Sequence, residues 1–430
     1  MNWRHRAITL LVFITLSGAM VFAQSVQKLT LAQAEAIALS NHPQISSFRY
    51  NALAANEATR EAKSAYYPTA IGSLTGAGAD DNSRIAAGGL NNPVILNRYS
   101  NGVAIGQLIT DFGRTKNLVA SSRFRAQAAQ ANVQTARQDV LLQVDRAYYD
   151  VLKAQAVLRV AEQTVKDRQL VADQINALAS NKLKSGLDVS FANVNLADAK
   201  LLLAQSQNDK QAALAALSAA LGYSDQRAFK VEDVPLPSTP LPQFADLVNQ
   251  AFHNRPELIS QRYTQQASEK FARAERDLRL PTISAIAAAG ETPVHQAALA
   301  DNYAAAGVNV NIPIFNGHLF AARRAQAEFK ARAEAENLRD LQDRIARDIR
   351  VAWLNANTAY QRLDLTHQLM QQATQALELA QSRYKLGLSS IVELSQAQLF
   401  QTQADIEQAS AKYDYEFQIA NLNYQVGASH

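Results

Sequence analysis

The sequence of 430 residues contains no cysteine and only three methionines. The absence of cysteine excludes a disulfide framework, thiolate ligands for a metal ion and a lipid anchor on an N-terminal cysteine. The seven histidines are scattered, with no pair at His-x-x-x-His spacing. The sequence therefore predicts no metal site, no cofactor and no enzyme.

Long apolar runs are also scarce. Residues 1–23 combine a basic start at Arg4 and Arg6 with an apolar stretch and a small-residue exit at Ala23, which predicts a signal peptide. No later run is long enough for a membrane-spanning helix. Without Arg4 and Arg6, 40 of the 42 basic residues remain against 38 acidic residues. This near balance indicates that nucleic acid is not a partner.

Glycine and proline are missing from residues 114–185 and 318–386, although the chain contains 16 and 11 of them. Such long gaps between helix breakers predict two very long helices, each ending at a Gly-Leu pair, Gly186-Leu187 and Gly387-Leu388. We expect Gly186 and Gly387 to be turn residues, because a chain that reverses after a helix commonly needs a left-handed residue there.

The chain is an internal duplication. Asn41-His42-Pro43 recurs 213 positions later as Asn254-Arg255-Pro256, and Leu221-Gly222 recurs 205 positions later as Val426-Gly427. The difference places about eight extra residues of the first copy between positions 76 and 99. The predicted organisation is a first repeat at 24–230, a proline-rich linker at 231–243 and a second repeat at 244–430.

Apolar and small residues follow a four-three spacing through both long helices, with one four-four step centred on Val140 and, 205 positions later, on Ile345. This pattern predicts coiled coils with a duplicated local unwinding. Rods of about 100 Å are far longer than a bilayer is thick, so they must stand in water. Their expected partners are helices at 31–65, 189–221, 244–280 and 391–426.

Two β-hairpins are predicted at 68–112 and 281–315, with strands at 68–79, 99–112, 281–290 and 303–315. The clearest alternation places four apolar residues on one strand face, away from Asn309 and Asn311. These residues, which would face lipid, are Val308, Val310, Ile312 and Ile314. The pattern fits transmembrane hairpins, but soluble hairpins would look the same.

Geometry limits the membrane alternative. Four strands cannot close a barrel, and open sheet edges are excluded from lipid. Three chains would supply twelve strands, with the long helices forming a matching tube. The predicted fold is mostly α with a small β part. If the hairpins lie in a membrane, it is a trimeric α-barrel of duplicated coiled-coil hairpins joined to a shared 12-stranded transmembrane β-barrel.

Nearly the whole chain after residue 23 resembles the TolC-type outer-membrane efflux family (outer membrane factors). Four segments in order carry the resemblance: Leu29-Thr30-Leu31 through Ala36-Ile37 to Asn41-His42-Pro43; Gln107-Leu108-Ile109-Thr110-Asp111-Phe112-Gly113-Arg114; Pro313-Ile314-Phe315-Asn316-Gly317; and Arg383-Tyr384-Lys385-Leu386-Gly387-Leu388-Ser389-Ser390-Ile391-Val392-Glu393-Leu394. The resemblance implies a homotrimer in the bacterial outer membrane with a long periplasmic extension. It also implies a periplasmic adaptor, an inner-membrane transporter and passive conduction of solutes in efflux or type I secretion.

The resemblance further implies two functional regions. Helix-hairpin tips that dock the adaptor match Lys184, Gly186, Leu187, Asp188, Lys385, Gly387, Leu388 and Ser389. The tunnel constriction matches Tyr384, Glu393 and Gln396, where Gln396 replaces one of two acidic positions. An arginine and an aspartate that latch the tip in well-known members correspond here to Ser389 and Ala192, so that latch is absent.

Other interpretations stay open at this point. Tyr384 lies on the four-three seam and could be a structural aromatic, and Glu393 could simply solvate an exposed helix. The alternative function is a secreted coiled-coil scaffold or adhesin whose β-hairpins form soluble caps. It shares the signal peptide, the heptads and the duplication, and it differs in whether the hairpins contact lipid.

Overall fold

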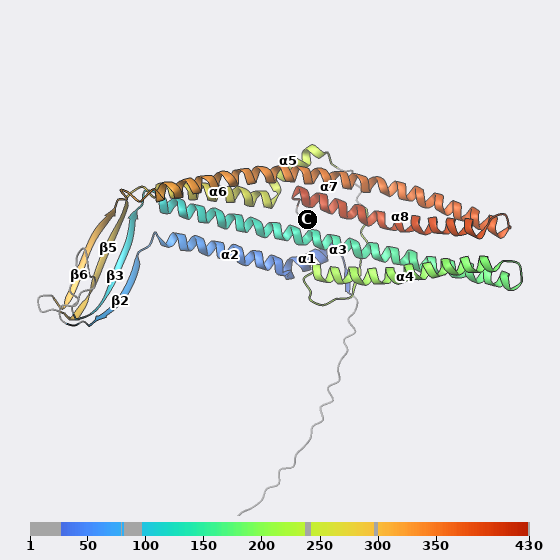
Figure 1. The fold of residues 1–430 in the computed structure, drawn as a ribbon, viewed down its shortest axis with the longest axis horizontal. Helices are drawn as coiled ribbons and strands as arrows, with labels where there is room; N and C mark the ends of the chain where they lie inside the picture. Colours follow the sequence, from blue (N-terminus) through green and yellow to red (C-terminus); the bar gives the residue numbers. More distant parts are fainter. Residues whose placement is uncertain (1–26, 79, 81–96, 237–241, 296–299, 429–430) are drawn as a thin grey trace, which may run out of the picture.

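The computed structural model describes residues 27–78, 80, 97–236, 242–295 and 300–428. They form a long rod, with a four-stranded sheet at one end and the turns between paired long helices at the other (Figure 1). The predicted signal peptide, most of the loop expected to carry the extra residues, and the middle of the predicted linker lie outside the described residues.

Eight helices lie within the described ranges: α1 (Leu31–Asn41), α2 (Pro43–Ser64), α3 (Arg114–Ser180), α4 (Gly186–Ala220), α5 (Phe244–Asn254), α6 (Pro256–Asp277), α7 (Leu319–Lys385) and α8 (Ile391–Val426). The long helices α3 and α7 contain 67 residues each, as the missing breakers predict. The ranges 31–65 and 244–280 were each expected to be one helix, which is wrong. Each is split before Pro43 or Pro256, because proline starts a helix well but cannot continue one.

The apolar and small residues at four-three spacing in α3 and α7 form the face of each helix that packs against its neighbours. Val140 and Ile345, at the four-four steps, are both fully buried. In the half of the rod near the sheet, α2 and α6 lie beside α3 and α7, while α4 and α8 lie beside them toward the tips (Figure 1). The helix α3 also packs on α6 and α8, so the two repeats share one body.

The duplicated motifs contact one another at mid-length. A Cβ added to Gly222, whose φ is +83°, would lie 3.1 Å from the Cα of His42. A Cβ on Gly427, whose φ is +74°, would lie 3.0 Å from the Cα of Arg255. Each Gly that ends α4 or α8 therefore packs against the Asn-x-Pro corner of its own repeat, which explains why both motifs occur twice.

The four long strands form one antiparallel sheet in the order β2-β3-β5-β6. They are β2 (Thr69–Ala77), β3 (Arg98–Thr110), β5 (Thr282–Val294) and β6 (Asn302–Asn311). The strand β5 runs past its predicted end at residue 290. The strand β6 stops at Asn311, short of Ile312 and Ile314, because Pro313 has no N–H to continue the ladder.

The strand register gives the sheet two faces, which differ most where β5 and β6 approach the helices. Directly opposed residues share a face, and one face carries the rows Ala70/Ile105/Ala287/Ala306, Gly72/Val103/Ala289/Ala304 and Ile283/Val310. The other face is mixed: it carries Ser284 opposite Asn309 and Thr282 opposite Asn311, and also the apolar row Ile71/Ala104/Ala288/Ala305. Polar residues interrupt the first face at two places. One is the row Asn101/Glu291/Asn302. The other is Gln107, whose amide donates to the Tyr66 carbonyl at 3.1 Å and the Leu108 carbonyl at 2.8 Å.

A two-stranded parallel sheet, which the sequence pattern did not indicate, joins β1 (Gln27–Leu29) to β4 (Phe229–Val231). The buried hydroxyl of Tyr148 on α3 donates to the Leu29 carbonyl at 3.0 Å and to the Glu232 carbonyl at 2.7 Å. These bonds tie both ends of the first repeat to its long helix.

Candidate functional site

The two helix turns at the tip have equivalent geometry but different sequences. In the α3–α4 turn Lys182 has φ +63°, and in the α7–α8 turn Gly387 has φ +74°. These residues are 205 positions apart, so they are true equivalents. The expectation for Gly387 is confirmed and that for Gly186 is wrong, because Gly186 is the first residue of α4, after the N-cap Ser185.

Lys182 therefore occupies a backbone conformation that glycine adopts more easily. We expect Lys182→Gly to stabilise the tip by about 0.5–1 kcal/mol, because glycine avoids the Cβ strain of a left-handed residue. Hydrogen exchange of the tip amides, including that of Leu183, would measure the gain. Lys182→Ala keeps the Cβ and should show no such protection; equal protection in both variants would contradict the strain argument.

The two hairpins pack on each other through a small apolar core behind the turns. Its buried members are Ala172, Ile175, Ala192, Leu196, Ala380, Tyr384, Ile391, Leu394 and Ala397. Tyr384 is only 6% exposed, and Ala192 only 3%. The seam position of Tyr384 is therefore a core position in this conformation, and Ala192 fills space where the resemblance would place an aspartate.

A polar contact closes this core on the side of α4. The Tyr384 hydroxyl donates to Asp188 Oδ1 at 3.0 Å. The other carboxylate oxygen accepts from the Ser185 backbone N–H at 2.9 Å and from its hydroxyl at 2.6 Å. The Lys184 ammonium lies 3.6 Å from the centre of the Tyr384 ring. Asp188 thus links the α7 tip to the start of α4, four residues before Ala192.

The surroundings stabilise this arrangement with Asp188 ionised. The hydrogen bond from the Ser185 side chain, together with those from its backbone and from Tyr384, and the charge of Lys184 hold the pKa of Asp188 below its usual value. Burial, and then the adjacent Asp188 carboxylate, raise the pKa of the Tyr384 hydroxyl. The tyrosine therefore remains a donor and the aspartate an acceptor at neutral pH.

Glu393 is the residue of the second repeat equivalent to Asp188, 205 positions later, and it makes a different contact. Its Oε1 lies 3.1 Å from Arg383 Nε, and both side chains are about half exposed. The sequence reasoning did not single out Arg383. Ser389 is not exposed, and its hydroxyl has no hydrogen-bond partner in the described part of the chain.

Large apolar side chains point into solvent at the tips. Leu183, Leu187, Leu386 and Leu388 are between 64% and 74% exposed. Two of them, Leu187 and Leu388, were predicted as docking residues; Leu183 and Leu386 were missed, although each precedes a predicted residue closely in the sequence. Four exposed leucines around two turns form an apolar patch, and such patches commonly mark a surface that binds a partner.

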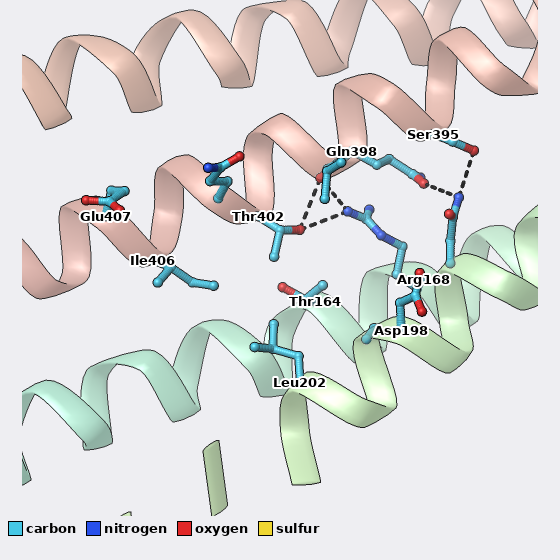
Figure 2. Close-up of a pocket in the computed structure, with 13 residues that line it drawn as sticks. Thr164, Arg168, Asp198, Leu202, Ser395, Gln398, Thr402, Ile406 and Glu407 are labelled. Carbon is cyan, nitrogen blue, oxygen red and sulfur yellow. Dashed lines mark hydrogen bonds between the residues drawn. The ribbon is translucent and has the colours of Figure 1, made fainter. Parts of the chain in front are cut away.

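A cavity of about 350 Å³ lies behind the tip core, between α3, α4 and α8 (Figure 2). Arg168 crosses it from α3 and donates to the Gln398 carbonyl at 2.6 Å and to the Thr402 hydroxyl at 3.0 Å. The Asn195 amide donates to the Ser395 hydroxyl at 2.8 Å. Arg168 continues the four-three spacing after Val165, but a search for apolar residues does not find it because arginine is charged.

No group of acidic and histidine side chains within the described ranges is arranged to hold a metal ion. Among the helices described, none is long and apolar enough to cross a membrane.

Comparison with known proteins gives one family. The family model described as outer membrane efflux protein matches residues 36–223 and 247–428. The outer membrane efflux protein BepC of Brucella suis biovar 1 (strain 1330) is 24% identical over 408 residues, covering 93% of this chain and 86% of the relative. The outer membrane protein TolC of Escherichia coli (strain K12) is 24% identical over 443 residues, covering 98% and 86%.

Solved structures show the same fold. A structure of CusC superimposes with a TM-score of 0.82 at 17% identity and covers 100% of this chain and 99% of its own. The outer membrane protein VceC of Vibrio cholerae gives a TM-score of 0.79 at 18% identity, covering 92% and 96%. With matches across both repeats and four family segments in order, the chain belongs to the outer membrane efflux protein family.

Proposed function

We propose that three copies of this chain form a passive duct through the outer membrane, which receives solutes from an inner-membrane transporter through a periplasmic adaptor. The single observation that carries the trimer is the four-stranded sheet. Its outer strands β2 and β6 each have one edge that pairs with no other strand in the described part of the chain. Lipid does not tolerate open edges, so β6 of one copy would pair with β2 of the next.

The faces of the sheet support the same arrangement. The face with Val103, Ile105, Ile283 and Val310 would contact lipid, and the face with Ser284, Asn309 and Asn311 would line the lumen. A secreted scaffold or adhesin with soluble β caps would leave the apolar face and both edges in water, and is therefore less favoured.

The helices offer a second surface for other copies. One face of α7 packs in the seam, while a separate stripe at helical spacing is exposed: Val351, Leu354, Leu365, Leu369 and Leu379, each 49% to 65% exposed. An apolar stripe of this length on a water-soluble rod needs a partner. Neighbouring copies arranged around a tunnel would cover it, each contributing two repeats, 24–230 and 244–430, joined by 231–243.

The tips would dock the adaptor. The exposed leucines at 183, 187, 386 and 388 would supply the apolar centre of this contact, and Lys184, Gly186, Lys385, Gly387 and Ser389 would surround it. Interfaces commonly combine an apolar centre with a polar rim. Asp188 would support this surface from within the tip, because its carboxylate accepts a hydrogen bond from the Tyr384 hydroxyl. Lys184 would belong to the rim and also contacts the Tyr384 ring.

Tyr384, Glu393 and Gln396 would form the constriction, with the Tyr384–Asp188 bond holding the α7–α8 hairpin against the α3–α4 hairpin. We expect Tyr384→Phe, which deletes only the hydroxyl, to raise the open probability of reconstituted channels about tenfold, since a hydrogen bond to a charged group is worth roughly 1.5–3 kcal/mol. Single-channel recording would measure it. Tyr360→Phe, at an exposed site on α7, is the control; identical currents in all three proteins would remove Tyr384 from gating.

The experiment that tests the trimer is the mass of the mature protein extracted from an outer-membrane fraction in mild detergent, from light scattering corrected for bound detergent. We expect a trimer in that fraction. A monomer or dimer that never enters the membrane fraction would refute the shared barrel and restore the scaffold interpretation.

A further inference from the structure

Both acidic residues of the tip lie at the start of a helix. Asp188 and Glu393 are each the third residue of their helices, α4 and α8, and each follows a serine N-cap, Ser185 or Ser390. The positive end of the helix dipole lies there and offsets part of the negative charge of a carboxylate. A carboxylate in this position projects a weaker field into the surrounding water than an isolated one.

Glu393 is also paired with a guanidinium group. Arg383 Nε lies 3.1 Å from Glu393 Oε1, and Arg383 Nη2 donates to the Leu388 carbonyl at 3.4 Å. An exposed ion pair of this kind adds little to stability. Its main physical consequence is electrostatic, because it places a positive charge beside the one acidic side chain that would face the constriction.

Basic residues outnumber acidic ones at the tip. Residues 181–190 and 382–393 contain Lys182, Lys184, Arg383 and Lys385 against Asp188 and Glu393. Gln396, one turn further along α8, adds no charge. Three copies meeting around a tunnel would repeat this excess of positive charge at its narrowest point. Rings of charged side chains decide which ions a pore admits.

We infer that Arg383 neutralises Glu393 and leaves the tunnel entrance positively charged, so that this channel admits anions and negatively charged solutes in preference to cations. The inference rests on the proposed function, since it requires the tips of three copies to surround the tunnel. It makes Arg383 a residue that determines ion selectivity, although it is not one of the four leucines of the apolar docking surface.

The test is the reversal potential of purified trimers in a planar bilayer under a potassium chloride gradient. We expect wild-type channels to favour chloride over potassium by roughly sevenfold, because a surface potential of about one kT per unit charge raises the local chloride concentration and lowers the local potassium concentration by about 2.7-fold each. Arg383→Gln exposes Glu393 and should shift the preference toward potassium, whereas Glu393→Gln should shift it further toward chloride. Arg60→Gln, which removes an exposed arginine from α2, should leave it unchanged.

The outcomes separate this inference from the proposed function. Cation-preferring wild-type channels, or a reversal potential that Arg383→Gln does not move, would overturn the role of Arg383 while leaving the channel in place. Absence of current from every trimer preparation would overturn the channel itself and the inference with it. Because Arg383 is exposed, loss of the trimer is not expected, and light scattering of each variant verifies this.

Discussion

Replacing Val310 with arginine is expected to lower the amount of assembled protein in the outer membrane. Val310 pairs with Ile283 on the apolar face of the sheet, and both residues lie on strands that the proposed barrel places in lipid. An arginine facing lipid costs about 2–4 kcal/mol near the midplane of the bilayer. The measurement is the amount of trimer extracted from purified outer membranes in mild detergent, compared with wild type at equal expression.

The neighbouring residue provides a matched control. Asn309 lies on the same strand, opposite Ser284, and its side chain lies on the polar face. Asn309→Arg introduces the same side chain but would place it in the aqueous lumen, so assembly should remain near the wild-type level. Equal loss in both variants, or normal assembly in both, would contradict the assignment of lipid and lumen faces.

Much of the helical architecture can be predicted because it depends on local signals. Absent breakers set the lengths of α3 and α7, and the four-three spacing identifies buried positions such as Val140 and Ile345. The 205-residue offset then predicts which residues are equivalent. The prediction for Gly186 is wrong because it matched the two Gly-Leu pairs, which are not 205 positions apart. The 205-residue offset from Gly387 instead assigns the left-handed position to Lys182.

The sheet and the tip contacts are harder to predict, because they join residues far apart in the sequence. The register of β3 against β5, and hence the two faces, emerges only when the repeats are folded together. The hydrogen bond between Tyr384 and Asp188 spans 196 positions, and the pattern of the family directs attention to Ala192 instead. Arg168 and Arg383 are missed since charged residues normally indicate a solvated face.

The buried carboxyl group of Asp145 is expected to make the stability of the helical rod depend on pH. Asp145 is 2% exposed, and Oδ1 has no hydrogen-bond partner among the described residues. Burial, and then the charge and hydrogen bond of the Glu35 side chain on α1, raise its pKa to about 8. Burial, and then the charges of Glu416, Asp145 and Glu35, raise the pKa of the neighbouring Tyr149.

The sign follows from proton binding. Below the ordinary aspartate pKa, the folded and unfolded chains both hold the proton, and no penalty arises. As the pH rises from there toward about 8, the unfolded chain releases its proton while the folded chain keeps it, so the free energy of unfolding falls. One proton corresponds to about 1.4 kcal/mol per pH unit, so the loss between about pH 5 and pH 8 is roughly 2–4 kcal/mol.

Asp145→Asn removes this titration while preserving a polar group that can donate to Glu35. We expect the variant to match wild type near pH 5 and to exceed it by roughly 2–4 kcal/mol near pH 8, from urea unfolding followed by far-ultraviolet circular dichroism. Burial also raises the pKa of Glu416 to about 7. Its titration should therefore leave a smaller fall of the unfolding free energy with pH in both wild type and Asp145→Asn. Asp173→Asn, at an exposed position of α3, is the control and should leave the pH dependence of the unfolding free energy unchanged. If Asp145→Asn also left it unchanged, Asp145 would be ionised in the folded protein over this whole pH range, beside Glu35 on α1.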